Sequence, residues 1–129
     1  MRVLLDTHVF LWLQTDPERL GAQLAIAEDP RTNLVLSAAS AWEIAIKHAL
    51  GRLPLPEPPV TYVPTRRHAI GAAALPIEHG HALAVAELPP VHRDPFDRML
   101  VAQSRLENLV LLTADPVFTR YDVDALAID

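Results

Sequence analysis

Short runs of aliphatic residues alternate along this chain with longer segments that have the residue pattern of helices. The aliphatic runs cover residues 3–5, 33–37, 72–76, 109–113 and 125–128. Helices are predicted between them, over residues 9–13, 20–28, 40–50, 60–70, 77–88, 95–106 and 117–120,. Strands separated by helices pair in parallel through right-handed crossovers. The pattern therefore predicts an α/β fold, a three-layer α/β/α sandwich with a central parallel sheet.

The length of the chain favours a single domain over residues 1–129, because 129 residues suit one compact hydrophobic core,. Prolines at positions 54, 56, 58 and 59 interrupt the middle of the chain. The segments on either side of them are too short to fold alone. We interpret this stretch as a connection within the domain rather than as a linker.

The composition excludes several classes of protein and of site. There are no cysteines, which excludes disulfides, thiolate zinc sites and cysteine nucleophiles,. No apolar run approaches the roughly 20 residues of a membrane helix, so no membrane partner is expected. Asp6 stands where a signal peptide would have to remain apolar,. We therefore expect a cytoplasmic protein.

Acidic residues follow the predicted strands. Asp6 comes directly after the first strand, and Asp115 comes two residues after the strand at 109–113. Glu43 lies one turn into the helix that follows the second strand, and Asp94 and Asp97 open the helix at 95–106. Because the carboxyl ends of parallel strands meet at one edge of a sheet, we expect these carboxylates to lie close together.

Carboxylates that converge in this way favour a metal-dependent hydrolase. Like charges repel, and a proton or a cation must resolve the conflict. Mg²⁺ and Mn²⁺ prefer carboxylate oxygens and water as ligands. One ion, or two ions about 3.5–4 Å apart, can activate a water and neutralise the charge that develops during phosphodiester hydrolysis.

Each acid also has a structural explanation that the sequence leaves open. Asp94 and Asp115 precede prolines, as N-cap residues often do,. Asp97 could simply favour the positive end of a helix dipole, and Asp6 could bond to the turn that follows it. Glu43 could complete a capping box with Ser40, or it could pair with Lys47 one turn later,.

Four stretches of the chain resemble the PIN-domain family, and within it the VapC-type toxins of bacterial toxin–antitoxin pairs. They are Leu-Leu-Asp-Thr-His at residues 4–8, the stretches 37–47 and 111–115, and residues 92–103, which begin with His-Arg-Asp-Pro-Phe-Asp-Arg. They stand in the family's order along a chain of about the family's length. A single stretch would be weak evidence, but the four together are specific.

The resemblance implies a PIN-like fold and a ribonuclease whose acids bind Mg²⁺ or Mn²⁺. It assigns Asp6 as the first metal ligand and Glu43 as the second acid, acting through water or as a base. Asp97 is then the third acid, and Asp115 the fourth. Asp94 is an additional acid and candidate ligand whose role is less defined. All the main positions are present, as expected of an active member.

The resemblance also implies substrate contacts and partners. Thr7 and Thr113 are candidates to support the site through their hydroxyls, and Arg93 and Arg98 are candidates to hold the RNA backbone. The net charge of −5 argues against a sequence-blind nucleic-acid binder,. Without the five site acids, however, acidic and basic residues would be equal in number. The expected substrate is a transfer or ribosomal RNA, cut in a single strand or loop.

Protein partners follow from the same resemblance. A cognate antitoxin is expected to neutralise the enzyme, with a basic side chain in the acidic pocket, and a homodimer is expected. Early helices carry apolar residues that could belong to the core or receive such a partner, namely Leu11, Trp12, Leu13, Trp42 and Ile46,. Alternative functions are a phosphatase with Asp6 as nucleophile, a non-catalytic binding module, and a nuclease that cuts DNA flaps.

Overall fold

The computed structural model describes residues 1–128 and contains a five-stranded sheet in which all paired strands are parallel. The strands lie in the order β3-β2-β1-β4-β5. Their bounds are β1 (Arg2–Leu5), β2 (Asn33–Ser37), β3 (Ala73–Leu75), β4 (Val110–Thr113) and β5 (Ala125–Ala127). The predicted strands are all present, including the two short edge strands β3 and β5.

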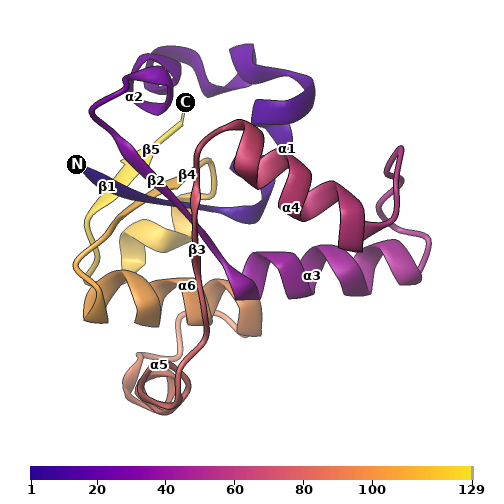
Figure 1. Cartoon of the computed structure of the whole chain (residues 1–129). Helices are drawn as coiled ribbons and strands as arrows, with labels where there is room; N and C mark the ends of the chain where they lie inside the picture. Colours follow the sequence, from indigo (N-terminus) through magenta and orange to yellow (C-terminus); the bar gives the residue numbers. More distant parts are fainter. Residues whose placement is uncertain (129) are drawn as a thin grey trace.

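Helices cover both faces of this sheet, which confirms the predicted three-layer sandwich (Figure 1). They are α1 (Thr7–Thr15), α2 (Leu24–Glu28), α3 (Ala38–Ala49), α4 (Pro59–Ala69), α5 (His79–Ala84) and α6 (Pro95–Leu106). Short 3₁₀ helices occupy Pro17–Gln23, Val85–Glu87 and Pro116–Arg120. In Figure 1, α5 and α6 lie below the sheet, and α1 and α2 lie above it. Within residues 1–128, no helix has the length and apolar character needed to cross a membrane.

The side chains of each strand divide between two hydrophobic cores. Val3 and Leu5 pack in one core, and Leu4 packs in the other, because successive side chains of a strand point to opposite faces,. The first core receives Phe10 from α1, and the second receives Leu100 from α6. Strands buried on both faces need apolar residues throughout, which explains why the sequence shows unbroken aliphatic runs.

The strand order places the first and fourth strands at a point where the connections diverge. After β1 the chain proceeds to β2 and β3 on one side, and it then returns to β4 and β5 on the other. Ligands in open α/β sheets bind at such a point, beyond the carboxyl ends of the strands. Asp6 follows β1, and Asp115 follows β4, so the topology directs both acids there.

Several helices differ in their bounds from the sequence prediction. The helix predicted at residues 9–13 is longer at both ends and spans Thr7–Thr15. The helix predicted at residues 20–28 is interrupted, because Gly21 adopts a positive φ of 55° that ends one helix before the next begins,. The helix predicted at 77–88 is divided into α5 and a 3₁₀ turn. The helix predicted from Ser40 begins two residues earlier, at Ala38.

Candidate functional site

Asp6 is fixed by the sheet rather than used as a helix cap. Its side chain is buried, 4% exposed, and its backbone N–H donates to the carbonyl oxygen of Leu112 at 3.0 Å. Thr113 Oγ1 donates to Asp6 Oδ2 at 2.8 Å, whereas the carboxylate makes no capping bond to α1. Burial raises the pKa of Asp6 above its ordinary value, and the hydrogen bond from Thr113 offsets part of that rise,.

Glu43 is a buried acid on α3, only 3% exposed, and it is paired with Lys47 one turn later. Lys47 Nζ donates to Glu43 Oε2 at 2.6 Å. The capping box with Ser40 is wrong, because α3 begins earlier and Ser37 caps it by accepting a hydrogen bond from the backbone N–H of Ala39 at 2.9 Å. The burial of Glu43 is therefore not explained by the start of the helix.

Asp94 and Asp97 occupy different positions at the start of α6. Asp94 Oδ1 accepts from the backbone N–H groups of Phe96 at 2.9 Å and Asp97 at 3.1 Å, so the cap role considered for Asp94 is confirmed. Asp97 stands in the first turn and is partly buried. Its Oδ2 lies 3.2 Å from Nε2 of His92, in the loop before the helix.

Asp115 is linked to Asp6 through a single hydroxyl. Its backbone N–H donates to Thr113 Oγ1 at 3.0 Å, and the same hydroxyl donates to Asp6. Asp115 Oδ1 accepts from the backbone N–H of Val117 at 3.0 Å and so caps the 3₁₀ helix after β4. The hydroxyl of Thr113 therefore contacts both Asp6 and Asp115, and its role in supporting a site stays a prediction.

The structure brings the five acids together. Burial is the main cause that raises the pKa of Asp97 to about 8, and the negative charges of Asp94, Asp6, Glu43 and Asp115 add to the rise in that order,. Residues from four separate parts of the chain therefore lie close enough to affect the ionisation of one carboxyl group. We call these five residues the acidic cluster.

Lys47 supplies a positive charge beside the acidic cluster. Its hydrogen bond to Glu43 is the main cause that raises the pKa of Lys47, and the charges of Asp94 and Asp97 raise it further. The side chain remains 41% exposed, so the ammonium group also faces solvent. This charge lowers the repulsion within the cluster only in part, since the pKa of Asp97 remains raised.

The acidic cluster suits a hard divalent cation by its chemistry, although it is not a ready-made metal site. Within residues 1–128, no three His, Asp or Glu side chains are arranged to hold an ion as they stand. Asp6, Glu43 and Asp115 each direct one oxygen to a protein donor. No donor in the described part of the chain bonds to Oδ1 of Asp97. Oxygen-only ligands fit Mg²⁺ or Mn²⁺, and either ion would relieve the repulsion.

The other predicted site residues have different surroundings. Thr7 is buried and donates to Ser40 Oγ at 2.8 Å, which ties α1 to α3. Arg93 is exposed in the loop before α6. Arg98 donates to carbonyl oxygens, and these contacts favour a structural role over the RNA contact predicted for it. The acceptors are Pro89, His92, Val85 and Leu88.

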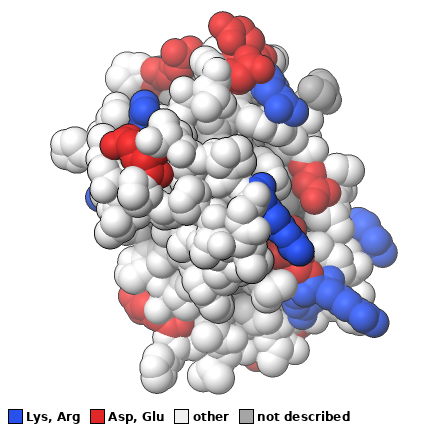
Figure 2. All heavy atoms as spheres, turned by 90° about the vertical axis from the view of Figure 1, so that its right-hand side faces the viewer, with Lys and Arg blue, Asp and Glu red and all other residues white. Residues whose placement is uncertain are grey.

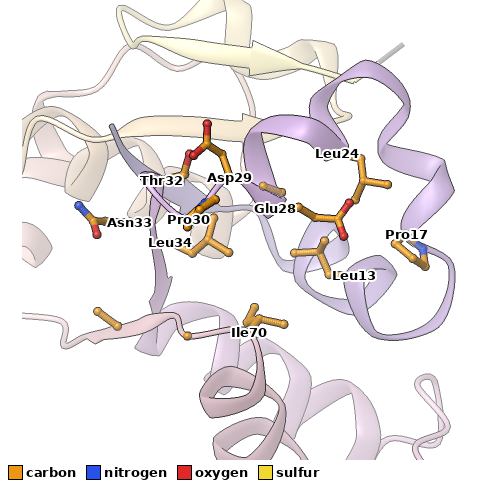
Figure 3. Close-up of a pocket in the computed structure, with 13 residues that line it drawn as sticks. Leu13, Pro17, Leu24, Glu28, Asp29, Pro30, Thr32, Asn33, Leu34 and Ile70 are labelled. Carbon is orange, nitrogen blue, oxygen red and sulfur yellow. The ribbon is translucent and has the colours of Figure 1, made fainter.

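One pocket of the surface is separate from the acidic cluster. On the face in Figure 2, basic side chains stand beside acidic ones rather than in one extended basic surface. The pocket in Figure 3 lies where β2 and β3 begin, and its lining includes Leu13, Leu24, Asn33 and Ile70. The acidic cluster follows the opposite ends of the strands, so this pocket is separate from it.

The raised pKa of Asp97 predicts how the stability of the metal-free protein depends on pH. Between the ordinary value of 3.8 and about 8, the folded chain holds a proton that the unfolded chain has lost. Stability must therefore fall as pH rises through this range, and the raised pKa of Asp6 acts in the same direction,. In EDTA, we expect a lower Tm at pH 8.5 than at pH 5.5, and Asp97→Asn should reduce this difference.

The control for this measurement is Asp16→Asn. Asp16 is an exposed residue that also precedes a proline, and its side chain makes no capping bond. This variant should keep the pH dependence of the unmodified chain. A Tm that is equal at both pH values, or an Asp97→Asn variant with an unchanged difference, would contradict the burial of charge described above.

The PIN domain family model matches residues 3–124. Among curated proteins, Ribonuclease VapC16 of Mycobacterium tuberculosis is 53% identical over 57 residues. That match covers 44% of this chain and 40% of the relative, so less than half of the relative's length is compared.

Solved structures resemble the whole chain. VapBC2 from Rickettsia felis, bound to a DNA fragment from its promoter, has a TM-score of 0.76 at 12% identity and covers 100% of both chains. DNA-bound VapBC from Salmonella typhimurium has a TM-score of 0.70 at 14% identity, with 100% of this chain and 99% of that one covered. FitAcB from Neisseria gonorrhoeae has a TM-score of 0.61 at 23% identity, covering 96% of each. These likenesses establish a shared fold.

Proposed function

The chain belongs to the PIN domain family, and from this premise we propose that it is the toxin of a toxin–antitoxin pair, a ribonuclease that depends on Mg²⁺ or Mn²⁺. The observation that carries the proposal is the acidic cluster beyond β1 and β4, in which the hydroxyl of Thr113 joins Asp6 to Asp115 and the other acids raise the pKa of Asp97. Such a cluster is costly to assemble unless a cation offsets its charge. The similarity to Ribonuclease VapC16 supports RNA as the substrate.

The residues of the acidic cluster would hold the ion. Asp6, Asp97, Glu43 and Asp115 are the candidate catalytic acids, with Asp94 as a further candidate ligand. When bound, the ion supplies an activated water and neutralises charge on the phosphate. Thr113 holds Asp6 and Asp115 in a fixed relation, and the ion pair with Lys47 holds Glu43.

Substrate and partners complete the proposal. Arg93 is an exposed candidate for the RNA backbone, and a single-stranded or looped region of a transfer or ribosomal RNA suits a site that reaches one phosphodiester,. The VapBC structures support an antitoxin partner. Trp42 is 56% exposed and Ile46 is 37% exposed on α3, which offers apolar surface to an antitoxin or to a second copy of the chain,. The expected compartment is the cytoplasm.

The proposal predicts metal-dependent cleavage that requires Asp6. Purified protein incubated with total RNA should produce discrete new RNA ends in Mn²⁺ or Mg²⁺ and none in EDTA, and Asp6→Asn should abolish them. Sequencing of the RNA ends is the measurement. Cleavage that persists in the variant would contradict the proposal. A phosphorylated Asp6 trapped by acid quenching would instead favour the phosphatase.

A further inference from the structure

A line of hydrogen bonds leads from the second core to the acidic cluster. Arg98 Nη1 lies 3.4 Å from the hydroxyl of Tyr121, and that hydroxyl lies 2.6 Å from His92 Nδ1. On the other side of the ring, His92 Nε2 lies 3.2 Å from Asp97 Oδ2. Four side chains from α6, the loop before it and the segment after the last 3₁₀ helix are therefore connected in series.

The groups are compatible with one common direction for these bonds, in the tautomer of His92 that carries its proton on Nε2,. A guanidinium group can only donate, so the hydroxyl of Tyr121 accepts from Arg98 and is free to donate to His92 Nδ1. A neutral imidazole that accepts at Nδ1 carries its proton on Nε2. In that tautomer, and with Asp97 ionised as a cation ligand would be, His92 donates to Asp97 and every bond in the series points toward the carboxylate.

The ring of His92 is held from several sides. Tyr121 is 5% exposed and its ring centroid lies 5.5 Å from that of His92, while Phe118 is fully buried and its centroid lies 6.3 Å away. Arg98 also donates to the carbonyl oxygens of His92 and Pro89, which anchors the backbone before the ring. These contacts fix the orientation of the ring, so that Nε2 of His92 faces Asp97.

The start of α6 does not require the hydrogen bond between His92 and Asp97. Asp94 already caps the helix with two hydrogen bonds, so Asp97 is free of that task. His92 occupies one oxygen of Asp97, and no donor within residues 1–128 bonds to the other. A histidine that fixes one oxygen and leaves the second one open acts as outer partners of metal-bound carboxylates do.

We propose that His92, oriented by Tyr121, is a positioning residue that aims Asp97 Oδ1 at the divalent cation of the acidic cluster. The inference rests on the proposed function, since it assumes that a cation binds there. It assigns to His92 neither contact with RNA nor transfer of a proton. Tyr121 acts only through the ring of His92.

The test measures Mn²⁺ binding without RNA, by calorimetry on the full chain. His92→Ala should weaken Mn²⁺ affinity by roughly 10- to 100-fold, the usual cost of losing an outer partner of a metal ligand. His92→Gln, whose amide can donate in place of Nε2, should recover part of the loss. Tyr121→Phe should weaken binding less than His92→Ala. His79→Gln, a change at an exposed histidine on α5, should bind Mn²⁺ like the unmodified chain.

Two further measurements separate positioning from loss of structure. Thermal unfolding in EDTA should be similar for His92→Gln and the unmodified chain, and excess Mn²⁺ should restore RNA cleavage by His92→Ala. Unchanged Mn²⁺ affinity in His92→Ala, or a glutamine variant no better than the alanine one, would overturn the inference. If the unmodified chain binds no Mn²⁺, the proposed function fails with it, whereas normal binding in all His92 variants rejects the inference alone.

Discussion

Asp97→Asn is expected to reduce RNA cleavage by more than about 100-fold. The loss should exceed that of His92→Ala, because it removes a proposed metal ligand rather than an outer partner of one. The substitution keeps the size of the side chain and its ability to accept from His92, and it removes the charge. The charges of the other four acids of the cluster raise the pKa of Asp97, so each of them lies close enough to affect its ionisation. Initial rates on one defined RNA at several Mn²⁺ concentrations would measure the effect.

The matched control is again Asp16→Asn, which removes one acid elsewhere and should leave the rate unchanged. Circular dichroism would confirm that both variants are folded. Because the loss reflects a missing ligand, the apparent Mn²⁺ requirement of Asp97→Asn should rise as well. A variant that cleaves within a few fold of the unmodified chain would remove Asp97 from the proposed site.

The same substitution should stabilise the protein that it inactivates. In the absence of metal, Asp97→Asn removes the charge that the folded state disfavours at high pH, so its Tm at pH 8.5 should exceed that of the unmodified chain,. Adding Mn²⁺ should then stabilise the unmodified chain more than the variant. Opposite effects on stability and activity are characteristic of residues retained for function at the expense of stability.

The strands were predictable because they are buried on both faces. Val3, Leu4 and Leu5 read as one aliphatic run since all three are fully buried, two in one core and one in the other,. Helix boundaries were less predictable. Both Ser37 and Ser40 are suitable caps, and the choice between them is made by the end of β2 and by the bond between Thr7 and Ser40.

The acids of the cluster were predictable from their positions after strands, but their supporting contacts were not. Tyr121 is 24 positions beyond Asp97 in the chain, and no local pattern connects it to His92. For Arg98, the sequence position suggested a contact that the structure does not favour. Its place beside Asp97 suggested a substrate contact, whereas its guanidinium donates to backbone carbonyl oxygens. Contacts of this kind depend on how the segments pack, which a single sequence does not show.

Phe118→Ala should cause the largest loss of stability, about 3–5 kcal/mol, because it removes a fully buried aromatic ring and leaves a cavity,. Phe118 packs in the second core against residues of the sheet and α6, and its ring lies edge-on to that of His92. Small domains are stable by only about 5–15 kcal/mol, so this loss would leave a marginal fold. Urea unfolding in EDTA would give the change in free energy.

Val60→Ala provides the comparison, because Val60 is 82% exposed and its truncation should change the free energy of unfolding by less than about 0.5 kcal/mol,. The cavity left by Phe118→Ala would also lie beside His92, so the variant should bind Mn²⁺ more weakly even at temperatures where it remains folded. Weaker Mn²⁺ binding by the folded variant would show that the metal site depends on the packing of the second core. If Phe118→Ala lost stability yet bound Mn²⁺ normally, the second core would not be what holds the ring of His92 in place.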